Sequence, residues 1–141
     1  MSGNMRPVIT ADFPILRPML LKIQEKNPLK QMVQADIDTA MAYVEDAVRD
    51  NRAYIVDDTF FVMFDVGTLW FSQEKFLLEQ LVLRISSNNF HVGNAVDALI
   101  ELAKFHGCTR VVVGDTQRGL MTPHYRAAGF EDLGTQLIKE I

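Results

Sequence analysis

The chain has 141 residues, of which 48% are hydrophobic and 23% charged, a composition typical of one globular domain with a proper core. A formal net charge of −4 and a pI of about 5.3 argue against a nucleic-acid-binding surface. The single cysteine, Cys108, excludes an internal disulfide, and neither a membrane-length apolar run nor a signal-peptide pattern is present. We therefore expect a cytoplasmic protein with no nucleic-acid or membrane partner.

The first third of the chain predicts a short strand and two helices. Residues 6–9 form the strand, and Thr10 is a suitable N-cap for a helix over residues 11–25, which Asn27-Pro28 ends. Apolar side chains at helical spacing predict a second helix over residues 35–50.

β-Forming residues dominate the middle of the chain. Residues 53–56 and 59–64 predict two strands joined by a tight turn at Asp57-Asp58. We expect Gly67 to interrupt the next run, which resumes over residues 69–71, and residues 72–75 to form a loop. Residues 76–85 form the longest β-like run, although their apolar content also suits a helix.

The last third alternates between helix and strand. A helix begins near Val92, and Gly107 stands where a left-handed C-cap is needed, before a buried strand over residues 109–113. Thr122-Pro123 is a good N-cap and first-turn pair for a short helix that Gly129 closes. Residues 130–133 and 136–141 predict a final strand pair that turns at Gly134-Thr135.

This order predicts one α/β domain over residues 1–141, a central mixed sheet with helices on its faces. The strand over residues 76–85 and the strand over residues 109–113 are joined through a helix, so we expect them to be parallel.

Two local patterns suggest chemistry. The segment Val92-Gly93-Asn94-Ala95 opens a helix directly after an apolar strand, and free N–H groups at such a start suit a pyrophosphate. The alternative is a turn with a steric glycine. Tyr125 lies four residues before Gly129-Phe130 and is a candidate proton donor, or a ring that packs in the core.

Glu79 is a candidate general base. Strict alternation places it on the same strand face as Leu77, Leu81 and Leu83, where desolvation favours proton uptake by a carboxylate. A β-bulge would change that facing, and a solvent-facing glutamate is the alternative.

Other chemistry-bearing residues favour structural roles. His106 and His124 lack a third ligand at metal spacing, so no metal site is expected, and Cys108 is most simply a packed thiol. Aromatic residues in the middle of the chain line either an acceptor pocket or the core, and the core is favoured: Phe60, Phe61, Phe64, Trp70, Phe71 and Phe76.

With these residues in place, the chain resembles a divergent, short member of the GCN5-related N-acetyltransferase superfamily, of a kind also encoded by phages. The order of elements is similar over the whole length. Gly93-Asn94-Ala95 matches the second half of the acyl-CoA signature, and Tyr125 with Gly129-Phe130 matches a later segment. Two positions depart from the pattern. Phe90 stands where a basic residue or Gln is usual, and Ser87 replaces a proline.

The resemblance implies an acyl-CoA N-acyltransferase fold with acetyl-CoA as co-substrate and no metal. It implies that Tyr125 protonates the CoA thiolate, while Glu79 is the candidate base from its own place in the strand. Arg84 or His91 is left as an alternative source of charge in place of Phe90. The residues implied to bind the co-substrate are Leu83, Arg84, Ile85, Phe90, His91, Val92, Gly93, Asn94, Ala95 and Thr116.

The sequence therefore predicts an acyl-CoA-dependent N-acyltransferase. It would transfer an acetyl group, by direct attack, to a primary amine of a small molecule or a protein. The alternative is a binding or structural protein that keeps this fold with weak or no catalysis. A homodimer is compatible with the pattern, which fixes no stoichiometry.

Overall fold

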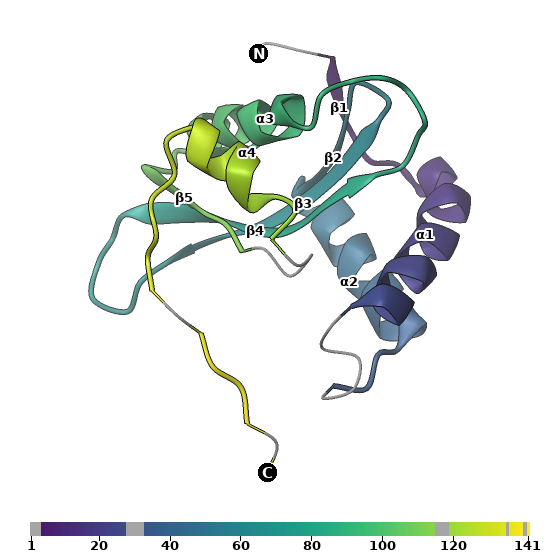
Figure 1. Ribbon diagram of the computed structural model, residues 1–141, viewed down its shortest axis with the longest axis horizontal. Coiled ribbons are helices and arrows are strands. Elements are labelled where there is room, and N and C mark those ends of the chain that lie inside the picture. The colour runs from purple at the N-terminus through teal and green to yellow at the C-terminus, as the bar shows by residue number, and fades with distance from the viewer. Residues whose placement is uncertain (1–3, 28–32, 115–118, 135, 140) are drawn as a thin grey trace.

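Helices cover both faces of a five-stranded sheet whose strands follow chain order, β1-β2-β3-β4-β5 (Figure 1). The computed structural model describes residues 4–27, 33–114, 119–134, 136–139 and 141. In these residues the strands are β1 (Met5–Pro7), β2 (Ala53–Val56), β3 (Phe60–Thr68), β4 (Lys75–Arg84) and β5 (Arg110–Val112). The helices are α1 (Phe13–Lys26), α2 (Ile37–Arg49), α3 (Gly93–Phe105) and α4 (Thr122–Ala127). The predicted mixed α/β sheet is confirmed.

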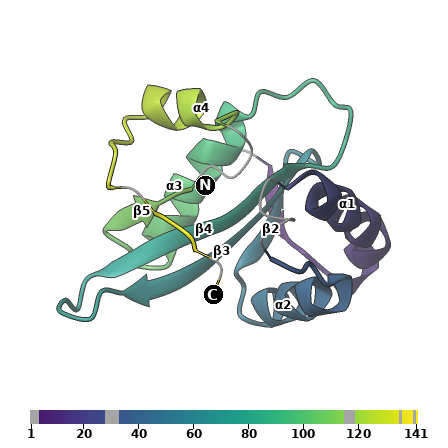
Figure 2. The same ribbon diagram turned by 60° about the horizontal axis from the view of Figure 1, so that its bottom comes forward.

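The sheet is mixed because only its last pair of strands is parallel. β1, β2, β3 and β4 pair antiparallel with their neighbours, whereas β4 and β5 run in the same direction. This confirms the parallel crossover through α3. Figures 1 and 2 show α1 and α2 on one face of the sheet and α3 and α4 on the other.

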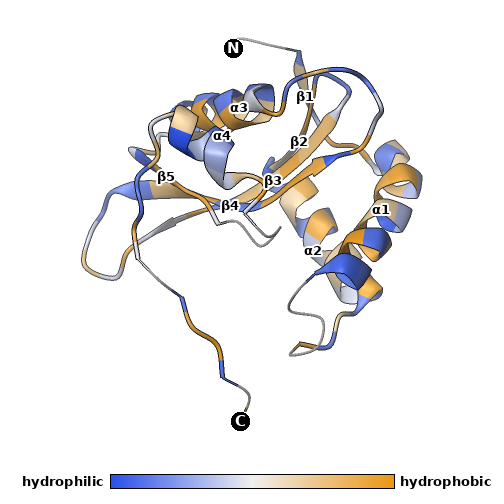
Figure 3. Cartoon of the chain, viewed as in Figure 1, coloured by the Kyte–Doolittle hydropathy of each residue, from blue (hydrophilic) through white to orange (hydrophobic). Residues whose placement is uncertain are grey.

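β3 is apolar on both faces because both faces are covered. Phe60, Val62 and Phe64 belong to the core cluster beneath α3 and α4, and Phe61 and Met63 belong to the cluster beneath α1 and α2. Figure 3 shows this strand as an apolar band between the two helical layers. Aromatic residues 60, 61 and 64 are therefore core residues, as favoured from the sequence.

Helix ends follow local chemistry. Gly107 has a φ of +73°, and the N–H of Cys108 donates to the carbonyl of Ala103 at 2.8 Å, which is a Schellman C-cap, as predicted for α3. The predicted cap at Thr122 is displaced by one residue, because Met121 is the N-cap of α4 and Thr122 and Pro123 lie in its first turn.

The N-terminal helix also begins later than predicted. Thr10 does not cap it; residues Thr10–Asp12 form a 3-10 turn, and α1 starts at Phe13. Asp12 organises this turn, because its carboxylate accepts from the Ile9 N–H and from both terminal nitrogens of the Arg6 guanidinium at 2.9 Å. The Arg6 hydrogen bond, despite partial burial, holds the pKa of Asp12 below its usual value.

Three predictions about strands are wrong. Gly67 does not interrupt β3, which continues to Thr68, and residues 69–71 lie in the β3–β4 loop, where Trp70 is 94% exposed. The predicted strand pair at the C-terminus is also absent from the described residues between 130 and 141, which have no regular structure. In these regions no opposing strand pairs with the β-forming side chains. By contrast, Asp57 and Asp58 both have positive φ and form the predicted hairpin turn.

No helix among the described residues is both long enough and apolar enough to cross a lipid bilayer.

Replacing Asp12 by Asn tests the N-terminal ion pair. A carboxylate whose pKa is lowered by folding stabilises the fold above its unfolded pKa, and that stabilisation is lost as the pH falls through the lower folded value. We expect Asp12→Asn to lower the free energy of unfolding by about 1 kcal/mol near pH 7, with the difference shrinking below about pH 4. Urea unfolding at several pH values measures this. A pH-independent difference would contradict the role of the charge.

Candidate functional site

The central feature of the site is the place where β4 and β5 part. The two parallel strands pair only from Phe76↔Arg110 to Leu78↔Val112, although β4 continues to Arg84. In the sheet formed by the described residues, the second half of β4 therefore has a partner only on its β3 side. Beyond Leu78 and Val112 the two strands are no longer paired, and we call this unpaired region beside the second half of β4 the gap.

The predicted residues Leu83, Arg84 and Ile85 lie at this end of β4. The Ile85 N–H donates to the Thr59 carbonyl at 2.7 Å, so Ile85 bonds toward β3. Because successive residues of an antiparallel strand direct their main-chain groups to opposite sides, the backbone of Leu83 also faces β3, and that of Arg84 faces the gap. Of the three residues, Arg84 is the one whose backbone is directed into the gap.

A β-bulge at Gln80 decides which way Glu79 faces. Met63 is opposite Leu81 but Phe64 is opposite Glu79, so Gln80 is the extra residue of β4. Glu79 and Leu77 consequently share the α3 and α4 face with Phe64, while Leu81 and Leu83 pack against the cluster beneath α1 and α2. The expectation that Glu79 shares a face with Leu81 and Leu83 is wrong for this reason.

Glu79 is half-buried at the opening of the gap. Its Oε2 accepts a hydrogen bond from the main-chain N–H of Gly114, two residues after β5, at 3.3 Å. This contact spans the two strands where their pairing ends. The structure thus brings the Glu79 carboxylate to the point where β4 and β5 part.

A polar cluster on α2, β3 and the bulge was missed by sequence reasoning. Asp65 accepts from the Tyr43 hydroxyl at 2.5 Å, from Arg52 at 2.5 Å and from the bulge residue Gln80 at 3.0 Å. Burial and the contact with Asp65 raise the pKa of Tyr43. The four residues are separated in sequence by up to 37 positions (80 − 43), so only tertiary structure assembles them. They link α2 to the bulge.

The amides at the start of α3 are not free, contrary to expectation. The Gly93 N–H donates to Nδ1 of His91 at 2.9 Å, the Asn94 N–H to the His91 carbonyl at 3.0 Å, and the Ala95 N–H to the Val92 carbonyl at 2.9 Å. The helix start is satisfied by its own loop. Among the described residues, the main-chain N–H groups of 89–92, immediately before the helix, have no acceptor.

A surface cavity of about 380 Å³ lies over this loop, between the end of β4 and α4. It is lined by Arg84, Asn89, Phe90, His91, Val92 and His124.

Arg84 organises the loop beside the cavity. Its guanidinium donates to the carbonyls of Asn88 and Phe90, both at 2.8 Å, and lies 4.7 Å from the centre of the Phe60 ring. Two of the five guanidinium N–H donors are used by these contacts, so Arg84 keeps donors for a ligand.

Two histidines face each other at the same cavity. The rings of His91 and His124 are 5.2 Å apart, edge to face. Because Nδ1 of His91 accepts the Gly93 N–H, the neutral ring carries its proton on Nε2, which can donate to an anion. A side chain at Gly93 would place its Cβ 2.7 Å from Nδ1 of His91, so glycine is needed for this close approach. From the sequence, His124 was considered only as a metal ligand and rejected, so its place at this cavity was not predicted.

Tyr125 is in the core cluster beneath α3 and α4, and only 4% of its surface is exposed. Gly129 has a φ of +93°, and the Phe130 N–H donates to the Tyr125 carbonyl at 3.1 Å. The rings of Tyr125 and Phe130 are 5.3 Å apart. The Tyr-Gly-Phe spacing is therefore explained by a Schellman C-cap with its apolar contact between Tyr125 and Phe130. This structural role is independent of any catalytic role of the tyrosine.

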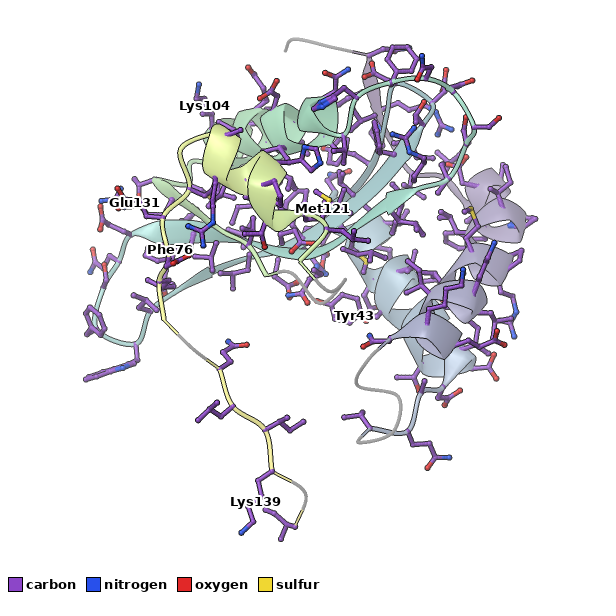
Figure 4. All side chains as sticks on the ribbon, in the orientation of Figure 1. Tyr43, Phe76, Lys104, Met121, Glu131 and Lys139 are labelled. Atoms are coloured by element: carbon purple, nitrogen blue, oxygen red, sulfur yellow. The ribbon has the colours of Figure 1, made fainter. Side chains whose placement is uncertain are left out.

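The remaining candidates fall elsewhere. Thr116 lies outside the described residues. Trp70 and Phe71 contact each other at the tip of the exposed β3–β4 loop, away from the core. Burial raises the pKa of the Cys108 thiol, which suits its predicted role as a packed side chain. Figure 4 shows Met121 where α4 begins, on the α3 and α4 side of the sheet.

Comparison with known proteins supports the fold alone. No protein-family model matches the chain, and no curated protein sequence matches it. Solved structures do. A predicted acetyltransferase from Clostridium acetobutylicum, solved with acetyl-CoA, is 17% identical, with a TM-score of 0.68 over 97% of this chain and 95% of that one.

Two further structures agree. An aminoglycoside N-acetyltransferase in complex with a CoA bisubstrate analogue is 12% identical, with a TM-score of 0.69 over 100% of this chain and 99% of that one. A ribosomal-protein-alanine N-acetyltransferase from Brucella melitensis is 12% identical, with a TM-score of 0.67 over 98% and 99%. These similarities establish a shared fold over the full length of the chain.

Replacing Gly129 by Ala tests the C-cap interpretation of the Tyr-Gly-Phe segment. A Cβ at positive φ is strained, so we expect Gly129→Ala to lower the free energy of unfolding by about 1–2 kcal/mol in urea titrations. Gly134→Ala is the matched control, because Gly134 has no positive φ and no neighbour within 4 Å, and it should be neutral. Equal stabilities for the two variants would contradict the C-cap.

Proposed function

Because the chain has the fold of the GCN5-related N-acetyltransferases, we propose that it is an acyl-CoA-dependent N-acyltransferase. It transfers an acetyl group from acetyl-CoA to the primary amine of a small molecule or a protein. The observation that carries this proposal is the gap between β4 and β5, with the Glu79 carboxylate held at its opening by Gly114.

The residues present suit both ends of acetyl-CoA. The gap-facing main chain of Arg84 offers hydrogen bonds that match the amides of a pantetheine arm. At the neighbouring cavity, Arg84, His91 and His124 offer donors to a phosphate, together with the loop amides of residues 89–92. These side chains and loop amides thus supply the phosphate donors that the satisfied amides of the α3 start and the apolar Phe90 do not offer.

The chemistry follows from the two candidate groups. Acetyl-CoA supplies a thioester carbonyl carbon. Glu79 takes a proton from the acceptor nitrogen, whose lone pair forms the new C–N bond while the C–S bond breaks. A phenol retains its proton at neutral pH, so Tyr125 gives that proton to the departing sulfur. No covalent enzyme intermediate is required, because the nitrogen attacks the carbonyl directly.

The second candidate is a binding or structural protein with this fold. The satisfied amides at the α3 start and the apolar Phe90 favour it, because both remove part of a phosphate site. The burial of Tyr125 favours it as well. Binding of CoA without turnover would identify this case.

The first test asks whether the protein binds CoA, and it is measured by thermal unfolding and by calorimetry. A ligand at a hundred times its dissociation constant adds about 2.7 kcal/mol to the stability of the native state. We expect Arg84→Gln to weaken CoA binding at least tenfold, because its guanidinium lines the cavity and holds the loop. Arg110→Gln removes the same charge from an exposed position outside the cavity and should bind normally.

Phe90→Arg extends this test, because it adds a cation to the cavity lining and should tighten CoA binding. The absence of any CoA-induced shift in the unmodified protein at millimolar concentration would overturn the proposal.

The second test separates catalysis from binding. Glu79→Gln keeps an oxygen that can accept from Gly114 but cannot take a proton, so we expect at least a hundredfold loss of kcat with little change in CoA affinity. Tyr125→Phe should also lower kcat more than affinity. Steady-state rates with a panel of amines, measured by release of free CoA thiol, decide this. Unchanged kcat in either variant would remove that residue from the mechanism.

A further inference from the structure

A second surface cavity, with a volume of about 260 Å³, lies at the start of α1. Its rim carries two charged groups, Arg6 of β1 and Asp58 of the turn between β2 and β3. Its floor is apolar and consists of Ile15, Leu16, Ile55 and Ile85. These floor residues lie on the α1 and α2 side of the sheet, whereas Arg84 and its cavity lie over Phe60 on the other side.

The size and the lining of this cavity suit a small molecule. Its volume is below the range of about 300–1,000 Å³ that is typical of pockets for drug-sized ligands. Leu16 and Ile55 are 0% and 3% exposed and therefore form a fixed floor, while Ile15 is 53% exposed and offers apolar surface that a ligand would cover. An apolar floor with a few charged groups at its edge is the usual composition of a small-ligand site.

Arg6 keeps two neighbouring N–H donors for a ligand. Its Nη1 donates to the Pro7 carbonyl and to Asp12, and its Nη2 donates to the other oxygen of Asp12. Among the described residues, these contacts leave the N–H of Nε and one N–H of Nη2 without an acceptor. Two adjacent guanidinium N–H groups match the two oxygens of a carboxylate.

Asp58 brings a second, opposite charge to the rim. Its carboxylate is exposed and forms no hydrogen bond or salt bridge with any described residue, whereas the neighbouring Asp57 accepts from the Asn4 N–H and the Asn94 amide. The hydrogen bond from Asp12 is the main cause that raises the pKa of Arg6, and the charge of Asp58 raises that pKa further. Asp58 is therefore close enough to Arg6 for one ligand to meet both charges.

The backbone at Asp58 indicates that this carboxylate is not there for the turn. Asp58 has a φ of +50° at the second position of a two-residue hairpin turn, where glycine is the preferred residue. Glycine adopts positive φ without strain, and the aspartate side chain makes no contact that would offset the strain. Strained positions of this kind are common at ligand sites.

From the cavity, the two N–H donors of Arg6 and the carboxylate of Asp58, we propose a binding site for a free α-amino acid with an apolar side chain. Such a ligand carries both charges at neutral pH. Its carboxylate accepts from Arg6, its ammonium donates to Asp58, and its side chain covers the apolar floor. A simple organic cation would leave the Arg6 donors unused, and a simple carboxylate would meet Asp58 without a counter-charge.

This site is separate from the gap between β4 and β5. Ile85 follows Glu79 by six positions along an extended strand, which places the cavity roughly 15–20 Å from the candidate base. A ligand in the cavity is therefore not the acceptor of the proposed acetyl transfer. The inference does not rest on the proposed function, and its test uses neither CoA nor turnover.

Calorimetry with L-leucine, L-methionine and L-phenylalanine, in the absence of CoA, tests the site. We expect Asp58→Asn to weaken binding at least tenfold while keeping the turn, because asparagine tolerates positive φ. Asp97→Asn is the matched control, because it removes the same charge from an exposed position on α3, and it should bind like the unmodified protein. Unchanged binding in Asp58→Asn would place the ligand elsewhere and overturn the inference.

Asp58→Gly separates binding from folding. It should also lose binding, yet its melting temperature should equal or exceed that of the unmodified protein, because glycine relieves the positive φ. A lower melting temperature would show that the carboxylate serves the turn, and this would remove the argument for a ligand.

Three analogues of leucine test the chemical class of the ligand. Isoamylamine lacks the carboxylate, isocaproate lacks the ammonium, and glycine lacks the apolar side chain. Each should bind at least tenfold more weakly than L-leucine. If isoamylamine binds as tightly as leucine, the site takes a simple cation and the inference is wrong. It is equally wrong if none of the three amino acids binds at millimolar concentration.

Discussion

The insertion of one extra residue, Gln80, into β4 controls the geometry of the site. Before the bulge, Leu77 and Glu79 face α3 and α4, and after it Leu81 and Leu83 face α1 and α2. Without the bulge, the alternation of the strand would place Glu79 and Leu81 on one face. Asp65 holds the bulge from the other side through Gln80, and Arg52 and Tyr43 hold Asp65. The direction of the Glu79 carboxylate thus depends on contacts made by the helical layer on the opposite face of the sheet.

The candidate phosphate site differs from the one that its sequence pattern suggests. A glycine at a helix start commonly leaves amides free for an anion. Here Gly93 has another role, because it lets His91 approach and accept the first amide of α3. The donors are thereby moved from the helix to the preceding loop and to the side chains of Arg84 and His124. In the proposed CoA complex, charge-assisted contacts from these side chains would take the place of the helix dipole.

Local sequence chemistry accounts for most of the fold. The positive φ at Asp57 and Asp58 and the Schellman cap at Gly107 follow from patterns within a few residues, and the parallel crossover into β5 follows from the order strand, helix, strand. Predictions failed where pairing depends on a distant partner. Gly67 stays in β3 because β4 pairs along its whole length, whereas residues 69–71 and the C-terminal tail have β-forming side chains but no opposing strand in the described chain.

The sequence by itself determined the order of the four helices and of the five strands that form the described sheet, and the glycine caps that end α3 and α4, because periodicity and capping are short-range properties. Tertiary structure alone decided the bulge, the contact of Glu79 with Gly114 and the assembly of Arg84, His91 and His124 around one cavity. These features join residues that are far apart in sequence, and their geometry depends on strand register and on packing across the sheet. No local pattern encodes either of these.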